Sequence, residues 1–302
     1  MNFNRFSYKK VLYLGLALGS LSIFPVYRLF IAPNTPSKQS ILEVLPAGNM
    51  HQNVQEILQK GSSVQDTLKA QLDIQHEAIV AEIKKAFPCT PEAWGQAYEE
   101  FERLKTQDNF IVANPRLKKN PNDLPIVLKV KELLVHNNID PERMTILTIN
   151  EPNNACDAAA GQCVNNNKVQ HFIRLNLAQL LQHDACVQEA LLTHEIMHLI
   201  NYDSLEFACI EKLFKDFTIE PKMYNNAPCF IDLNKFIEYR ADLMASAQGI
   251  GIATALQQAM TEHMAEFADD IISTNHPSCK QRYEAIANLA EYMKAENQMK
   301  IA

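Results

Sequence analysis

The feature that most constrains this chain is an apolar segment carrying His194-Glu195-Ile196-Met197-His198. Apolar residues at 190–192 and 199–200 predict a largely buried helix, and Asp184 is placed to cap its first turn. Residues four apart share one face of a helix, so both imidazoles can bind one zinc ion. Glu195 is turned about 100° from His194, so it can reach a zinc-bound water as general base without being a ligand. The alternative is two hydrogen-bonded helix histidines beside a salt-bridged glutamate.

A second pair of acidic residues, Glu238 and Asp242, shows the same four-residue spacing on a stretch predicted to be helical. Like charges at this spacing repel on a bare helix. A zinc ion near Glu238 and an imidazole near Asp242 would instead stabilise both negative charges. The sequence therefore predicts Glu238 as third ligand of one Zn²⁺ per chain. Asp242 is expected to accept a proton from the free ring nitrogen of His194. The alternative is an exposed acidic face partly neutralised by Arg240.

The order of expected elements predicts an α+β protein that is predominantly helical. Hydrophobic residues make up 47% of the chain and charged residues 21%, as in ordinary globular proteins. A net charge of −7 without a basic block argues against nucleic acid as a partner. Periodicity and turn residues predict a helical N-terminal region at 50–120, a helix at 124–138, strands at 145–149 and 170–177, a polar loop at 150–168 between them, and mostly helix from 184 onward.

In its second half the chain resembles the gluzincin metallopeptidases typified by the CAAX-prenyl-protein endopeptidase and the bacterial heat-shock protease HtpX. Four pieces occur in the family's order between about 144 and 287: Asn154-Ala155, the His194-Glu195-x-x-His198 helix with its lead-in at 180–192, Glu238-Tyr239-Arg240-Ala241-Asp242, and His276-Pro277-Ser278 followed by Arg282. The departures are Thr193, Ile196 and Met197 at positions where the family has smaller residues. The family's multiple membrane spans are missing, and residues 50–120 have no counterpart.

The resemblance implies a zincin-like metallopeptidase domain at 121–302 that holds a small mixed sheet and an active-site helix. It implies that His276 and Arg282 lie near the active site, with His276 in a catalytic role at the oxyanion; the alternative for both is a structural role. It also implies that a sheet edge beside the zinc binds the substrate as an added strand. We assign that edge to the strand containing Ile173, Arg174 and Leu175.

The amino terminus is basic and then apolar: Arg5, Lys9 and Lys10 precede an almost wholly apolar run at 11–27, and residues 33–49 look like a linker. Residues 1–32 are consistent with an uncleaved membrane anchor, a signal segment or a buried core helix. The anchor would place the catalytic domain outside the cytoplasm, on the periplasmic side of a bacterial inner membrane. Signal cleavage would instead give a secreted or periplasmic protein.

Seven cysteines are many for a reducing compartment. Cys156 and Cys163 are close together in the polar loop, so a small disulfide-closed loop is expected there; the alternative is that the cysteines are small buried hydrophobic residues. Together these features predict a zinc endopeptidase that acts on protein or peptide substrates. Two alternatives remain: a non-catalytic peptide-binding chaperone or regulator, and a latent enzyme whose cleft is blocked by residues 50–120 or by a cysteine.

Overall fold

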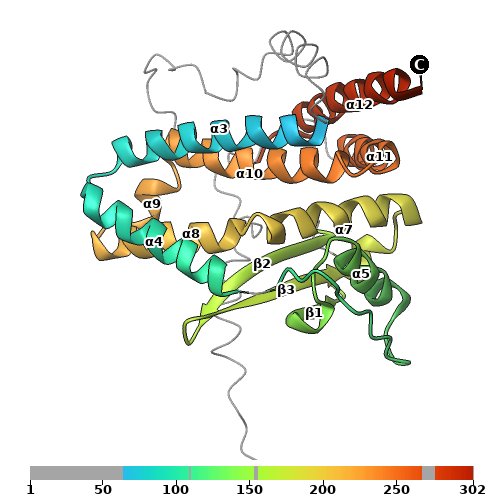
Figure 1. Ribbon diagram of the computed structural model, residues 1–302, viewed down its shortest axis with the longest axis horizontal. Coiled ribbons are helices and arrows are strands. Elements are labelled where there is room, and N and C mark those ends of the chain that lie inside the picture. Colours follow the sequence, from blue (N-terminus) through green and yellow to red (C-terminus); the bar gives the residue numbers. More distant parts are fainter. Residues whose placement is uncertain (1–63, 109, 153–155, 267–275, 302) are drawn as a thin grey trace, which may run out of the picture. The chain divides into compact units, whose positions relative to one another are not determined.

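A three-stranded mixed sheet lies beside one long buried helix in the computed structural model, which describes residues 64–108, 110–152, 156–266 and 276–301 (Figure 1). The strands are β1 (Met144–Ile149), β2 (Ala158–Asn165) and β3 (Lys168–Asn176), in the spatial order β1-β3-β2. Strand β1 pairs with β3 in parallel, and β2 pairs with β3 antiparallel. The central strand is therefore β3, and both other strands are edges.

Helices make up most of the rest of the described chain, which confirms the predominantly helical α+β prediction. Those before the sheet are α3 (Val64–Ala86), α4 (Pro91–Gln107), α5 (Pro125–His136) and the short 3₁₀ helix η3 (Pro141–Arg143). Those after it are α6 (Leu177–Leu180), α7 (Ala185–Ile200), α8 (Asp203–Asp216), α9 (Pro221–Tyr224), α10 (Pro228–Ser246), α11 (Ile250–Glu266) and α12 (Cys279–Ile301). The expected cap of α7 is present: Asp184 accepts hydrogen bonds from the backbone N–H groups of Cys186 and Val187, both at 2.9 Å.

The region expected to be a polar loop contains a strand instead. Residues 158–165 pair with β3 along their whole length, from Ala158 opposite Leu175 to Asn165 opposite Lys168. Asn166 and Asn167 join the two strands with φ of 50° and 59°, the backbone of a tight two-residue hairpin turn. The strand lacks β-branched residues over most of its length, so its own sequence gives little indication of a strand; pairing with β3 fixes it.

Packing against two partners buries α7. Helix α7 contacts β2 on one side and α10 and α11 on the other, and α3 runs along the far side of α10 (Figure 1). Apolar residues of α3, including Leu72, Ile79 and Ile83, join one core cluster with Phe236 of α10. The N-terminal helices are thus part of the packing that supports α10.

The expected membrane attachment is corrected by the structure. Within the described part of the chain, no helix is both long and apolar enough to cross a membrane. The segments on which that expectation and the linker rested, residues 1–32 and 33–49, lie outside the described residues, as do Asn154 and Ala155. The described residues all fall within one compact unit, Gln39–Ala302.

Strand β2 passes very close to the start of α8 at Gly161. A Cβ built at this residue would lie 2.8 Å from Oγ of Ser204 and 3.0 Å from Cζ of Phe172. We expect Gly161→Val to lower the free energy of unfolding by about 1–3 kcal/mol, because the added side chain overpacks this contact. Urea unfolding of the full chain followed by circular dichroism measures the change.

The matched control is Gly95→Ala in α4, where a Cβ meets no heavy atom within 4 Å. Alanine is the better helix former, so this variant should be neutral or gain up to about 1 kcal/mol. Equal stability of Gly161→Val and the unaltered chain would contradict the close approach.

Candidate metal centre

Helix α7 presents His194 and His198 on one face, with their Nε2 atoms 3.0 Å apart. Both residues are buried, at 5% and 9% exposed. The preceding Thr193 satisfies its own hydroxyl within the helix, donating to the backbone carbonyl of Glu189 at 2.7 Å. Its departure from the family pattern therefore leaves the helix intact, and the predicted arrangement of the two imidazoles is what the structure shows.

Helix α10 packs against α7 and brings Glu238 to the same point. Its Oε2 lies 3.6 Å from Nε2 of His194 and its Oε1 3.7 Å from Nε2 of His198. The ligand atoms of the three residues all lie within 4.8 Å of one another, so they could hold one metal ion. Glu238 is thus the third member of the group, 40 positions from His198 in the chain.

Asp242 lies where the sequence placed it, one turn along α10 and 2.8 Å from Nδ1 of His194. Arg282 of α12 donates to both oxygens of this carboxylate, from Nε at 2.6 Å and from Nη2 at 2.8 Å. Burial alone would raise the pKa of Asp242, but the charges of Arg282 and His194 and their hydrogen bonds outweigh it and lower the pKa. Asp242 therefore stays ionised and fixes the orientation of the first imidazole.

The structure adds an equivalent partner for the second imidazole, which the sequence analysis missed. Asp203, at the start of α8, places Oδ2 2.7 Å from Nδ1 of His198, and Arg240 of α10 donates to its other oxygen. Both are buried, at 2% and 6% exposed. The chain thus contains two parallel arginine–aspartate–histidine sets. Asp203 follows His198 by five residues, a spacing that predicts no contact if one helix continues through both. The contact could be inferred only once it is known that α7 ends at Ile200.

Glu195 lies outside the ligand group and contacts the sheet. Its Oε2 accepts a hydrogen bond from the backbone N–H of Ala160 in β2 at 2.7 Å. Burial raises the pKa of Glu195, and the neighbouring His194 and His198 only partly offset this. The carboxylate is therefore placed between the histidine pair and an edge strand, with a raised proton affinity that suits a general base.

This contact corrects the predicted substrate edge. Ile173, Arg174 and Leu175 belong to β3, which is paired on both sides and has no open edge. The strand beside α7 is β2, whose Ala160 directs its N–H away from β3. The alternation of β3 was correctly recognised, but the position of a strand within a sheet is a tertiary property that alternation does not encode.

His276 and Arg282 both border the ligand group. Nδ1 of His276 lies 3.5 Å from Oε1 of Glu238, and Nη1 of Arg282 lies 3.6 Å from its Oε2. The two differ in exposure, since the His276 side chain is 41% exposed and that of Arg282 15%. His276 can therefore meet a bound molecule, whereas Arg282 is part of the buried support.

The expected Cys156–Cys163 disulfide is absent. All seven cysteines are thiols, and Cys163 lies in β2 whereas Cys156 precedes it. The extended strand from Ala158 to Cys163 alone spans about 17 Å, at roughly 3.4 Å per residue, and Cys156 lies only two residues before Ala158. The two cysteines are therefore at least about 10 Å apart, whereas a disulfide needs Cα atoms within about 7 Å. The thiol of Cys156 instead donates to the backbone carbonyl of Ala158 at 2.9 Å.

Comparison of the chain with protein-family models, characterised proteins and solved structures gave no match. The functional assignment therefore depends on the geometry of the centre and on the sequence pattern.

Protons on the two imidazoles would compete with a metal ion for this centre, because the pKa of each imidazole is raised. Burial would lower the pKa of His194, but attraction to Asp242 and the hydrogen bond that the imidazole donates to this carboxylate, with a further one to Glu238, raise the pKa to about 10. A raised pKa means that protonated His194 stabilises the metal-free fold below about pH 6.5, and that this contribution is lost as the pH rises through about 10. Metal ions bind neutral imidazole, so binding releases the proton.

We therefore expect the affinity for Zn²⁺, used as the probe, to rise with pH between 6 and 9, by about tenfold per pH unit for each proton released. Competition with a chromophoric chelator measures it. Asp242→Asn should flatten this dependence because it removes the main attraction on protonated His194, whereas Asp216→Asn, at an exposed position of α8, should leave it unchanged. An affinity that does not vary with pH would contradict the protonated state.

Proposed function

We propose that this chain is a zinc-dependent endopeptidase that cleaves extended or unfolded protein segments. The observation that carries the proposal is the convergence of His194, His198 and Glu238, with Glu195 placed beside them and outside the ligand group. This is the arrangement expected for metal-assisted hydrolysis, with three protein ligands and a separate general base. A zincin-like core and a relationship to the gluzincin family are part of the same proposal.

The spacing of the ligand atoms suits zinc. Tetrahedral coordination with bonds of about 2.0–2.1 Å puts neighbouring ligand atoms about 3.3 Å apart. The separations here are 3.0, 3.6 and 3.7 Å, which bracket that value. Two imidazole nitrogens and one carboxylate oxygen are also a typical donor set for catalytic zinc.

The charge of the surroundings supports a divalent cation. If all carboxylates around the two histidines are ionised, their four negative charges face two guanidinium groups. With both imidazoles neutral this leaves a surplus of two negative charges, which protons on the imidazoles offset and which one bound divalent cation would balance when it replaces those protons. The groups concerned are Glu195, Asp203, Glu238 and Asp242, with Arg240 and Arg282.

Each side chain then has a role in peptide hydrolysis. Zinc bound here would supply Lewis-acid activation of water and of the peptide carbonyl. Glu195 would take the proton of the attacking water and pass it to the leaving amine. The partly exposed His276 would stabilise the oxyanion. Asp203, Asp242 and Arg282 would act only by holding the ligands in place.

Strand β2 supports extended polypeptide as the substrate. Ala160 directs its N–H away from β3, where Glu195 accepts it, and the antiparallel alternation places the main-chain groups of Ala158 on the same side, where its carbonyl accepts from the Cys156 thiol; a substrate strand would take over these bonds. A substrate segment paired along this edge would bring its backbone next to the general base. Main-chain pairing demands little of the substrate's sequence, so broad specificity for unfolded segments follows.

The decisive experiment is Glu195→Gln, which we expect to retain zinc and to lose at least a hundredfold in the rate of cleavage of unfolded casein, since general-base catalysis contributes about 10²–10⁴-fold. Metal analysis and release of labelled peptides measure the two quantities. Glu189→Gln is the matched control, because this glutamate lies on α7 and pairs with Lys129 away from the ligand group.

His198→Ala should lose both zinc and cleavage. Zinc binding without any cleavage by the unaltered chain would favour the peptide-binding alternative. Full activity of Glu195→Gln would exclude the mechanism.

A further inference from the structure

The junction between α7 and α8 has an unusual backbone. Tyr202, the second of the two residues between the helices, adopts φ 58° and ψ 33°, in the left-handed region that bulky residues rarely occupy. Its N–H donates to the carbonyl of Leu199 at 3.1 Å, and its own carbonyl accepts from Glu206 at 3.0 Å. This single residue ends one helix and starts the next, so its conformation sets the direction in which α8 leaves.

A buried aromatic cluster holds Tyr202 in that conformation. Its side chain is 4% exposed and makes edge contacts with Phe110, at 5.3 Å between ring centres, and with His171, at 6.1 Å. Phe110 in turn stacks on His171 at 3.9 Å. The ring of Tyr202 is thus fixed by residues from the α4–α5 connection and from the central strand.

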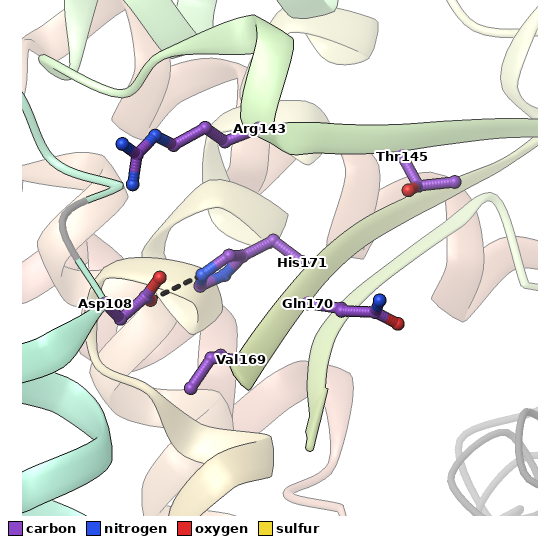
Figure 2. A pocket seen from close by; sticks show the side chains of 6 residues that line it. All are labelled: Asp108, Arg143, Thr145, Val169, Gln170 and His171. Atoms are coloured by element: carbon purple, nitrogen blue, oxygen red, sulfur yellow. Dashed lines mark hydrogen bonds and ion pairs between the residues drawn. The ribbon is translucent and has the colours of Figure 1, made fainter. Parts of the chain in front are cut away.

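Asp108 completes the anchor. Burial, and then the charge and hydrogen bond of Asp108, raise the pKa of Tyr202, so the hydroxyl stays a donor to that carboxylate. Asp108 also lies 2.5 Å from Nε2 of His171 (Figure 2). Together with Arg143, this pair lines a pocket at the start of β1 and β3, a site distinct from the metal ligands.

Asp203 follows Tyr202 directly and contacts the metal group. It is the first residue of α8, and its carboxylate lies 2.7 Å from Nδ1 of His198. A change of Tyr202 to an ordinary helical or extended backbone would redirect α8 at its first residue and swing this carboxylate away. The conformation of one tyrosine thus determines whether the second imidazole has its acceptor.

We infer that Tyr202 is a positioning residue for the metal centre, and that the Asp108–Phe110–His171 cluster acts through it, by way of Asp203, on His198. The inference rests on the proposed function, since it assumes that His198 binds a metal ion. It also gives the α4–α5 connection a role in the chemistry of a site to which it contributes no ligand.

The test is the dissociation constant for Zn²⁺ of the full chain, obtained by chelator competition. Tyr202→Gly accepts the left-handed backbone but removes the anchored ring, and we expect its dissociation constant to rise at least tenfold, as for the loss of other residues that orient metal ligands. Tyr202→Phe keeps the ring contacts and loses only the hydroxyl bond to Asp108, so its dissociation constant should rise by less than that of Tyr202→Gly, by about threefold. Asp203→Asn should raise the dissociation constant as much as Tyr202→Gly. Because both changes act through the same contact with His198, the dissociation constant of the double variant should not exceed that of whichever single variant binds zinc less tightly.

Thr218→Gly is the matched control, because Thr218 also has φ 58° but lies beyond the other end of α8. Its zinc affinity should be unchanged. If Tyr202→Gly does not fold, Phe110→Leu tests the same anchor and should raise the dissociation constant at least threefold while circular dichroism shows that the chain still folds. If the folded Tyr202→Gly chain or Phe110→Leu binds zinc with the affinity of the unaltered chain, this inference alone is overturned. If the unaltered chain does not bind zinc, the proposed function is overturned as well.

Discussion

The centre depends on two buried carboxylates that hold two imidazoles toward one point. Without Asp203 and Asp242, nothing described in the structure would keep both Nε2 atoms directed at Glu238. Each carboxylate is itself secured by an arginine, and these arginines come from α10 and α12. Breaking a buried ion pair leaves an uncompensated charge and typically costs about 3–5 kcal/mol. The packing of four helices is therefore coupled to the geometry of three ligand atoms.

Local patterns were sufficient to predict the part of the centre that lies on single helices. His194, Glu195 and His198 are defined by helical periodicity, and Glu238 and Asp242 by the same four-residue step on α10. Both strands recognised from alternation and β-branched residues occur within a residue or two of their expected bounds. These features depend on neighbours in the chain, so the sequence alone could reveal them.

The features that were missed depend on tertiary contacts. Asp203 gains its role only because the left-handed backbone of Tyr202 returns it toward His198. Strand β2 was expected to be a loop because its alanines and Gly161 give no strong strand pattern. The prediction of a disulfide between Cys156 and Cys163 was wrong for the same reason, since an extended strand lies where a compact loop was expected. The order of strands, which makes β2 the edge beside Glu195, is likewise set by pairing partners far apart in the chain.

The position of α3 has a practical consequence for shortened forms of the protein. Its apolar face covers the side of α10 that faces away from α7, and Gln65 donates to the carbonyl of Ala247 just beyond the end of α10 at 2.6 Å. His76 stacks on Phe236 and pairs with the buried Glu206. A recombinant fragment designed to begin after α4 would leave this surface of the ligand-bearing helix open to solvent. The start of a minimal fragment should therefore be placed before Val64 rather than just before the first strand of the sheet.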